Sequence, residues 1–216
     1  MAGLAGYTTT VKMTGTPTAM SSEAMSTNST AANTYKVTTA TKRIFDRAAS
    51  FSFFEATTTG GRAAIAAGDI SAIDYLFGKV TFSSTQSEPV TVSGNYLPAT
   101  NVAGANTYGM DMTRELLDRT DFTSTGFRQR HPGLVDVSLT VSRFDSVDLT
   151  FINAINSTQT VVCEVRPGGT GSSEAGRGFF LVESENRSGD ISGLETGELS
   201  FQLDGSSEGA FSWGVP

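Results

Sequence analysis

The chain contains few of the residues from which most catalytic and metal sites are built. Among 216 residues there is one cysteine, Cys163, and one histidine, His131. A single cysteine excludes an internal disulfide framework and fits a reducing compartment. A single histidine excludes a His-rich metal site, and a His-dependent nucleophile would need His131 beside Cys163 or a serine. We interpret Cys163 as a buried apolar side chain and His131 as a surface loop residue.

Long apolar runs and an excess of positive charge are also missing. No stretch approaches the roughly 18 consecutive apolar residues of a membrane-spanning helix, and the start, MAGLAGYTTTVK, lacks the features of a secretory signal. The 15 Lys and Arg residues stand against 22 Asp and Glu residues, which gives a net charge of −7. An acidic chain without a basic stripe is not built to grip nucleic-acid phosphates. Residues 161–216 hold nine acids and three bases, so most of the negative excess lies there.

Two stretches approach ligand-binding motifs without matching them. Asp145 and Asp148 lack the central glycine and closing glutamate of an EF-hand, and helix capping explains them better. The glycine-rich run from Gly168 to Gly178 lacks the Gly-Lys-Ser/Thr ending of a phosphate-binding loop. We therefore expect no enzyme activity, no metal and no cofactor.

Short alternating runs dominate what is present. The clearest is Val135 to Ser142 (VDVSLTVS), in which every second residue is aliphatic. Period-two alternation is typical of a half-buried antiparallel strand, and Pro132-Gly133 before it indicates a chain reversal. Similar runs at Thr160–Arg166 and Glu198–Asp204, with turn residues between them, predict a mainly β fold, a β-sandwich or barrel.

Helices and loops are predicted at fewer places. Ser146 to Ile155 is the best helix, because apolar residues recur there at threes, and Met112 to Phe122 is compatible with a short one. The latter falls in an expected long loop over residues 95–133. Residues 14–32 lack periodicity and are predicted to be either a mobile loop or an arm that orders on a neighbouring subunit. We expect one domain over residues 1–216, with one or two short flanking helices, this long loop and terminal arms.

Short motifs follow one another in a fixed order over most of the chain. The first are Thr34-Tyr-Lys-Val-Thr-Thr-Ala-Thr-Lys-Arg with Phe45-Asp46, and Ile73-Asp-Tyr-Leu-Phe-Gly-Lys-Val-Thr-Phe. The later ones are Asp118-Arg-Thr-Asp-Phe, Phe127-Arg, Pro132-Gly-Leu-Val-Asp, Gly178-Phe-Phe-Leu-Val-Glu-Ser, Ser188-Gly-Asp-Ile-Ser-Gly-Leu and Leu199-Ser-Phe-Gln-Leu-Asp-Gly. None is specific alone. In this order they resemble the major tail protein, or tail tube protein, of long-tailed bacteriophages.

The resemblance implies a structural virion protein with a β-sandwich and a flanking helix. Its copies would form rings, usually hexameric, that stack into a hollow tube through which DNA passes without specific binding. Inner sheets of neighbouring subunits would join into a barrel around the lumen. The implied partners are further copies of the chain and other tail proteins (tape measure, terminator, tail tip), with no membrane. The protein would be made in the bacterial cytoplasm and reside in the virion tail.

The expected contacts between subunits lie in two places. The methionines of the 14–32 segment would be unusual in a solvated loop, and the 112–144 stretch mixes arginines with acids, as polar interfaces and solvated faces both do. The candidate contact residues are Met20, Met25, Arg114, Arg119, Asp121, Phe127, Arg128 and Arg130. Deleting Thr123 to Arg130 should block tube growth and leave the sandwich folded.

Two rival functions remain at this point. One is another ring-forming component, such as a tail terminator, a sheath subunit or a secreted ring protein, which would stop at single rings. The other is a β-sandwich carbohydrate-binding module. Such modules present exposed aromatic side chains on a flat face, and the single tryptophan, Trp213, lies next to the C-terminus. An enzyme is the least favoured reading, because no catalytic constellation supports it.

Overall fold

The computed structural model describes residues 10–28, 31–57, 60–102, 104–120, 127–144, 153, 155, 160–168, 174–189, 195–205 and 209–215. In these residues the fold is mainly β, with two antiparallel sheets and two short 3-10 helices, η2 (Ala40–Lys42) and η3 (Ala67–Asp69). This confirms the predicted sandwich or barrel with few helices. The chain divides into two compact units. The first comprises Met1–Val102, Val161–Phe179 and Ser206–Pro216, and the second Ala103–Thr160 and Phe180–Gly205. The expectation of a single domain stays a prediction.

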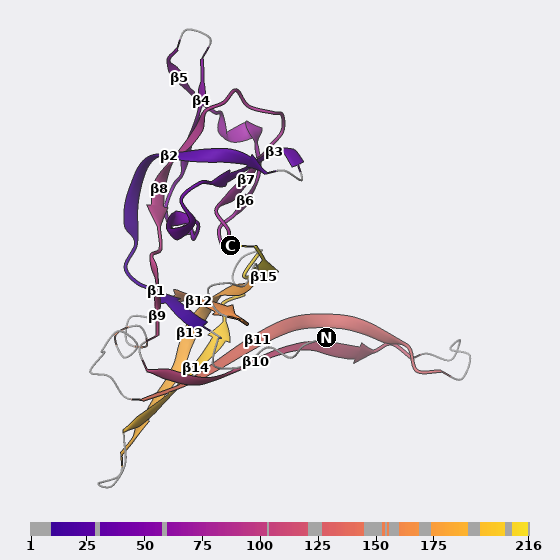
Figure 1. The fold of residues 1–216 in the computed structure, drawn as a ribbon. Coiled ribbons are helices and arrows are strands. Elements are labelled where there is room, and N and C mark those ends of the chain that lie inside the picture. Colours follow the sequence, from indigo (N-terminus) through magenta and orange to yellow (C-terminus); the bar gives the residue numbers. More distant parts are fainter. Residues whose placement is uncertain are drawn as a thin grey trace. The chain divides into compact units, whose positions relative to one another are not determined.

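One sheet of the first unit is built from a single continuous stretch of chain (Figure 1). Its strands are β2 (Thr18–Asn28), β3 (Ala31–Val37), β4 (Ser52–Ala56), β5 (Arg62–Ala64), β6 (Ile70–Asp74), β7 (Lys79–Phe82) and β8 (Val90–Tyr96), in the spatial order β5-β4-β8-β2-β3-β7-β6. Alternating side chains meet in one core, as in β7, where Val80 and Phe82 are buried and Lys79 and Thr81 are half-buried. The other core residues are Met20, Met25, Tyr35, Val37, Phe45, Phe53, Val90 and Val92.

Strand β2 corrects the expectation of a mobile loop or arm over residues 14–32. Met20 and Met25 are each 5% exposed and belong to the core of their own sheet, so they are not available as contacts between subunits. Their spacing of five is odd, and a regular strand would place them on opposite faces. The structure has a register shift between Met20 and Glu23, where Ser22 adopts φ +50°. Because of this bulge, the side chains of both methionines face the core. The bulge also interrupts the alternation of buried and exposed residues, so period two is not visible in the sequence of this strand.

The remaining strands of the first unit form part of a second sheet. They are β1 (Thr10–Thr14), β9 (Ala99–Asn101), β12 (Thr160–Arg166), β15 (Phe211–Gly214) and the first residues of β13 (Ala175–Ser188). Strand β1 lies between β12 and β9, and β15 pairs with Ala175–Gly178 of β13. Because Thr14 and Ala99 are Cα partners, residues 15–98 leave and re-enter this sheet at adjacent positions.

The turn between β6 and β7 depends on a glycine. Gly78 has φ +60°, and a Cβ there would lie 2.8 Å from both the Cα and the carbonyl oxygen of Arg43. Gly78→Ala is therefore expected to destabilise the chain by about 1–3 kcal/mol, because it adds both backbone strain and a steric clash. Urea unfolding would measure the loss. Gly68→Ala is the control, since a Cβ at Gly68 meets no atom within 4 Å, and an equal loss in both variants would contradict the argument.

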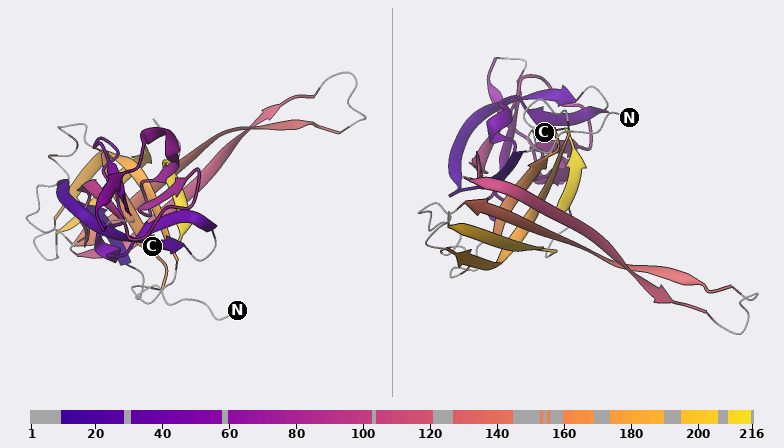
Figure 2. Two further views of the ribbon diagram at one scale, coloured as in Figure 1. Left: turned by 90° about the horizontal axis from the view of Figure 1, so that it is seen from above. Right: turned by 60° about the horizontal axis from the view of Figure 1, so that its bottom comes forward.

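The second unit contains β10 (Ala105–Asp118), β11 (Arg130–Phe144), β14 (Thr196–Leu203) and the later part of β13, in the order β10-β11-β14-β13 (Figure 2). The alternation in β11 is as the sequence indicates, with Val137, Leu139 and Val141 buried. On β14, Leu199 and Phe201 are the Cα partners of Val141 and Leu139 and are buried with them. The predicted core strand is thus confirmed, apart from Val135, which is 43% exposed.

Two expectations for residues 95–133 are wrong. Met112 to Asp118 belongs to strand β10 and is not helical. The described residues of the range 95–133 lie mostly in strands, namely the end of β8, β9, β10 and the start of β11, and not in an irregular loop. The adjacent Leu116 and Leu117 suggest a helix in the sequence, whereas in the structure they lie on opposite faces of a strand. The predicted helix over Ser146 to Ile155 lies outside the described residues, apart from Asn153 and Ile155.

Candidate inter-subunit surface

Strands β10 and β11 continue beyond the rest of their sheet. Strand β14 pairs with β11 from Ser138 to Phe144, while Arg130–Val137 is paired, among the described strands, with β10 alone. The result is a two-stranded arm, Met112–Asp118 with Arg130–Val137, that projects from the sheet of the second unit (Figures 1 and 2). An isolated pair of strands has no sheet or helix to bury its side chains against and is only marginally stable in water.

The buried face of the sheet continues along the arm as exposed apolar side chains. The Cα partners Met112 and Val137, Arg114 and Val135, and Leu116 and Pro132 follow one another on this face. Val137 is 1% exposed, but its partner Met112 is 57% exposed, and further out Val135 is 43% and Leu116 55% exposed. Leu134, beside a register shift, is 81% exposed. We call Met112, Leu116 and Val135 the apolar stripe, and exposed apolar patches of this kind are typical of surfaces that contact a partner.

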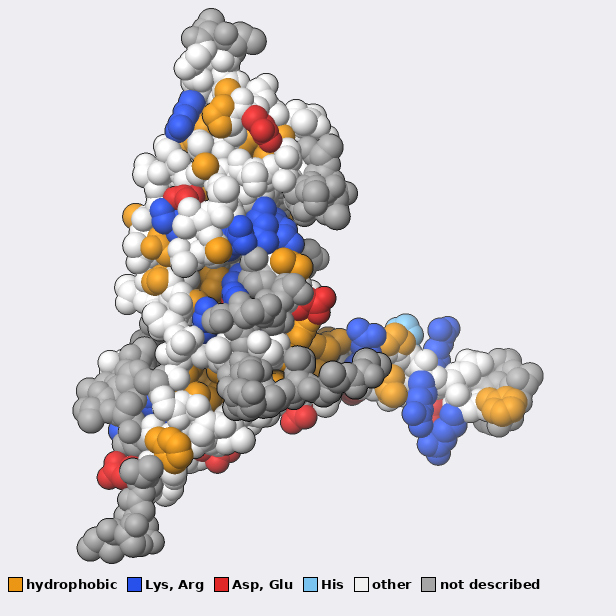
Figure 3. All heavy atoms as spheres, in the orientation of Figure 1, with side chains coloured by type: hydrophobic (Ala, Val, Ile, Leu, Met, Phe, Trp, Pro, Cys, Tyr) orange, Lys and Arg blue, Asp and Glu red, His pale blue; other side chains and the backbone are white. Residues whose placement is uncertain are grey.

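The predicted arginines lie on the same arm. Arg114 and Arg130 are in its strands, Arg119 and Arg128 follow toward its tip, and all four are exposed, as is Phe127 at 80%. Figure 3 shows hydrophobic and basic side chains side by side in this region. Of the candidate contacts, five are thus brought together, while Met20 and Met25 lie in the core of the first unit. Asp121 lies outside the described residues.

Hydrogen bonds hold the two strands together near the tip. The Thr120 hydroxyl and backbone N–H donate to Asp118 Oδ1 at 2.5 and 2.8 Å, and these bonds lower the pKa of that carboxyl. The Thr120 hydroxyl accepts from the Gln129 N–H at 3.1 Å, and the Arg119 N–H donates to the Gln129 carbonyl at 2.9 Å. The arm therefore keeps a defined geometry up to these residues.

Sequence reasoning missed the apolar stripe. The signal was present, because Met112, Arg114 and Leu116 alternate with Thr113 and Glu115, but an arginine in the stripe breaks the apolar pattern. The alternation of β11 also begins at Val135, two residues before the first buried side chain. This longer alternation could have indicated that the strand continues beyond the residues whose side chains are buried.

A second charged feature, in the first unit, is built around Glu164. Its side chain is 1% exposed and accepts from Arg177 Nε and Arg166 Nε, each at 2.6 Å, with Lys12 Nζ at 3.7 Å. Arg177 also donates to the Leu76 carbonyl at 2.6 Å. Burial favours the protonated carboxyl, but the arginines outweigh it and lower the pKa of Glu164. A pocket of about 200 Å³ adjoins this cluster.

Other potential chemistry is limited in the described part of the chain. Cys163 is buried, and burial raises the pKa of its thiol, which makes it a poor nucleophile. His131 is exposed, as expected, but it lies in strand β11 of the arm and not in a loop. The described residues contain no group of three or more His, Cys, Asp or Glu side chains that could hold a metal ion. Among them there is also no helix with the length and apolar character needed to cross a membrane.

Comparison with known proteins gives structural similarities only. Neither a protein-family model nor a curated protein matches the sequence. The chain is similar in fold to a chain in the tail of an empty GTA particle with C6 symmetry (19% identity, 55% of this chain and 87% of that chain, TM-score 0.47). It is also similar to a chain in the virion of a native gene transfer agent particle (20% identity, 54% and 89% covered, TM-score 0.46). A third similar structure is the SPP1 tail tube (13% identity, 78% and 77% covered, TM-score 0.40).

Proposed function

We propose that the chain is a structural subunit that assembles with copies of itself into the tail tube of a phage-like particle. The observation that carries this proposal is the apolar stripe, which continues a buried sheet face along a projecting arm. A neighbouring copy would supply the cover that this face has within its own sheet but lacks on the arm. A stripe that packs on a different surface of the neighbouring copy makes a heterologous contact, and contacts of that kind build rings and filaments.

The tube is the specific form of assembly suggested by the sequence motifs. In that form, rings of the subunit stack into a hollow conduit, DNA passes through it, and the arm contributes contacts between subunits. The net charge of −7 supports passage without binding, because like charges repel DNA from the wall. The subunit needs no cofactor for this role. Its place would be the virion tail, beside the tape measure, terminator and tail-tip proteins.

Negative-stain electron microscopy of the purified protein over a concentration series tests this proposal. We expect monomers at low concentration and hollow tubes of uniform width above a critical concentration, with tail-tip components added if growth needs an initiator. Assembly that stops at single rings would instead indicate a terminator-like component. A strict monomer that binds glycans and ignores tail-tip components would contradict the proposal and favour the carbohydrate-binding alternative.

A further inference from the structure

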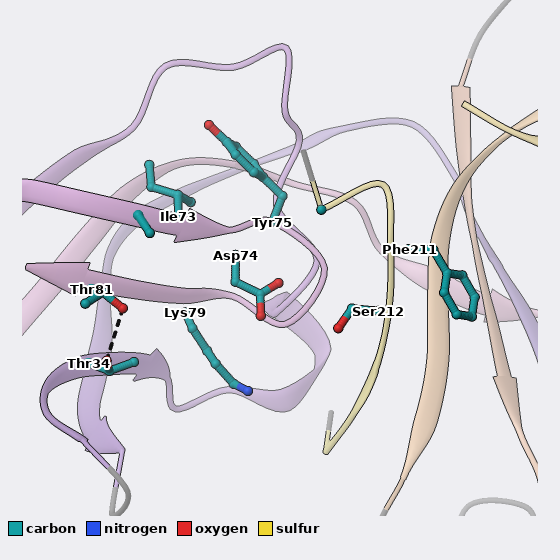
Figure 4. A pocket seen from close by; sticks show the side chains of 10 residues that line it. Thr34, Ile73, Asp74, Tyr75, Lys79, Thr81, Phe211 and Ser212 are labelled. Atoms are coloured by element: carbon teal, nitrogen blue, oxygen red, sulfur yellow. Dashed lines mark hydrogen bonds between the residues drawn. The ribbon is translucent and has the colours of Figure 1, made fainter. Parts of the chain in front are cut away.

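Two pockets of the first unit differ in the charge of their lining. The larger one, of about 370 Å³, is lined by one base and one acid, Lys79 and Asp74, which are Cα partners on β7 and β6 (Figure 4). Thr34 and Thr81 also line it, and their hydroxyl groups are hydrogen-bonded to each other at 3.1 Å. The formal charges of this lining cancel, so the larger pocket has no preference for an ion of one sign.

The smaller pocket, of about 200 Å³, is lined by three bases and one acid. The bases are Lys12 on β1, Arg166 on β12 and Arg177 on β13, and the acid is Glu164 on β12. Glu164 counts as a full negative charge at neutral pH, because its pKa lies below the ordinary value despite burial. Three positive charges and one negative charge give this lining a net charge of +2, in a chain whose overall net charge is −7.

The single acid leaves hydrogen-bond donors of two bases unoccupied. Glu164 Oε2 accepts from Arg177, which also donates to the Leu76 carbonyl. Glu164 Oε1 accepts from Arg166 Nε at 2.6 Å, and Lys12 Nζ lies 3.7 Å from the same oxygen, which is beyond hydrogen-bond distance. Within the described part of the chain, the Lys12 ammonium and the two Nη groups of Arg166 therefore have no acceptor.

These two bases are neighbours that solvent can reach. Lys12 and Glu164 are Cα partners across β1 and β12, and Arg166 is two residues from Glu164 on the same face of β12. The side chains of Lys12 and Arg166 are 22% and 16% exposed, whereas that of Glu164 is buried. An ion from solution can therefore contact both cations, while the carboxylate between them is shielded from solvent.

We infer that the smaller pocket binds one small oxyanion from solution, of the phosphate or sulfate type, between Lys12 and Arg166. Ammonium and guanidinium groups form strong charge-assisted hydrogen bonds with such anions. Thr41 of η2 also lines the pocket and offers a hydroxyl donor. Sites for drug-sized ligands measure roughly 300–1,000 Å³, so this pocket suits a single anionic group. The bound ion would neutralise the excess charge of the lining, a role that does not depend on self-assembly.

Isothermal titration calorimetry with inorganic phosphate tests the site, with NaCl added to keep the ionic strength constant. Lys12→Gln removes a base that makes no hydrogen bond within the described chain, so the protein should stay folded. We expect this variant to bind phosphate about tenfold to a hundredfold more weakly, because it loses a charged donor. Lys79→Gln is the same change at a half-buried lysine of the larger pocket, and it should bind phosphate like the wild type.

Glu164→Gln gives a second readout, with the opposite sign. Without its one acid the lining has a net charge of +3, so phosphate should bind more tightly than in the wild type. A ligand that binds the folded state raises Tm. Phosphate should therefore raise the Tm of Glu164→Gln by more than that of the wild type, and the Tm of Lys12→Gln by less. A purely structural role of Glu164 would lower Tm by the same amount at every phosphate concentration.

Three outcomes would overturn the inference. Absence of phosphate binding would show that the pocket is not an anion site. Equal phosphate affinity in the wild type, Lys12→Gln and Lys79→Gln would indicate an adventitious ion only. Phosphate that inhibits assembly of the wild type but not of Lys12→Gln would show that the pocket receives an acidic side chain of a second copy. None of these results contradicts the proposed function, because a subunit can build tubes with or without a bound ion.

Discussion

Leu116→Ser is expected to block tube growth, whereas Leu117→Ser is expected to leave it nearly normal. The two residues are adjacent, chemically identical and similarly exposed, at 55% and 48%. They differ in the face they occupy: Leu116 pairs with Pro132 on the apolar stripe, and Leu117 pairs with His131 on the opposite face. The two variants therefore have the same composition and strand propensity and a similar exposure at the substituted residue. A difference in their assembly would come from the face of the arm that each residue occupies.

The size of the effect follows from the apolar surface that the partner would cover. Burying one large aliphatic side chain is worth about 1.5–3 kcal/mol, and about 1.4 kcal/mol corresponds to a tenfold change in an equilibrium constant. Leu116→Ser should therefore raise the critical concentration roughly tenfold or more. Substituting Met112, Leu116 and Val135 together should abolish assembly at any practical concentration, while the monomer stays folded because these side chains are exposed.

Electron microscopy and sedimentation of the variants would measure assembly, and circular dichroism would verify that the monomers are folded. Equal effects of Leu116→Ser and Leu117→Ser would show that the arm does not use one face. Normal tubes from the triple variant would show that the apolar stripe of the arm makes no contact that assembly needs. Deleting Thr123 to Arg130 tests the predicted contacts near the tip separately, because it removes Phe127, Arg128 and Arg130 and leaves every residue of the stripe in place.

The sequence predicts this fold well where alternation is regular and poorly where strands are irregular or uncovered. Strand β11 follows strict period two and was identified with its buried residues. Strand β2 contains a bulge, which makes its two core methionines look unpatterned. The arm is even more difficult to predict from the sequence. Its side chains do not pack against the rest of the sheet, so buried and exposed positions do not alternate clearly along it. Local sequence specifies pairing only when one face is covered by the same chain.

The sequence identified only part of the candidate surface, and the reason is related. Polar and charged candidates such as Arg114 and Arg130 were identified from composition and do lie on the arm. The stripe beside them is a property of two strands in register, and no single segment displays it.

Glu164→Gln is expected to be among the most destabilising single substitutions in the first unit. The side chain of Glu164 is 1% exposed and that of Arg177 3% exposed, and the pair is further held by Arg166. Removing the carboxylate leaves the buried guanidinium of Arg177 without a counter-charge. Breaking a buried pair in this way costs about 3–5 kcal/mol, which corresponds to a fall in Tm of roughly 6–20 °C for a chain of this size.

A double substitution distinguishes the cost of the unpaired charge on Arg177 from the cost of lost packing. Replacing both partners, in Glu164→Gln/Arg177→Met, removes the unpaired charge and should recover part of the stability, because apolar replacements of buried pairs are often tolerated. Glu198→Gln is the same chemical change at an exposed carboxylate and should alter monomer stability by less than about 0.5 kcal/mol. A double variant less stable than Glu164→Gln would show that Arg177 stabilises the unit through its other contacts.

The carboxylate of Glu164 should also affect how the stability of the folded chain falls at acidic pH. Because the pKa of Glu164 is lowered in the folded chain, its contribution is fully present above the ordinary value of 4.5 and is lost as the pH falls through the folded value. Thermal unfolding between about pH 7 and pH 3 should therefore show a steeper loss in the wild type than in Glu164→Gln. Parallel profiles would mean that other carboxylates dominate acid unfolding and that the arginines around Glu164 do little to hold it ionised.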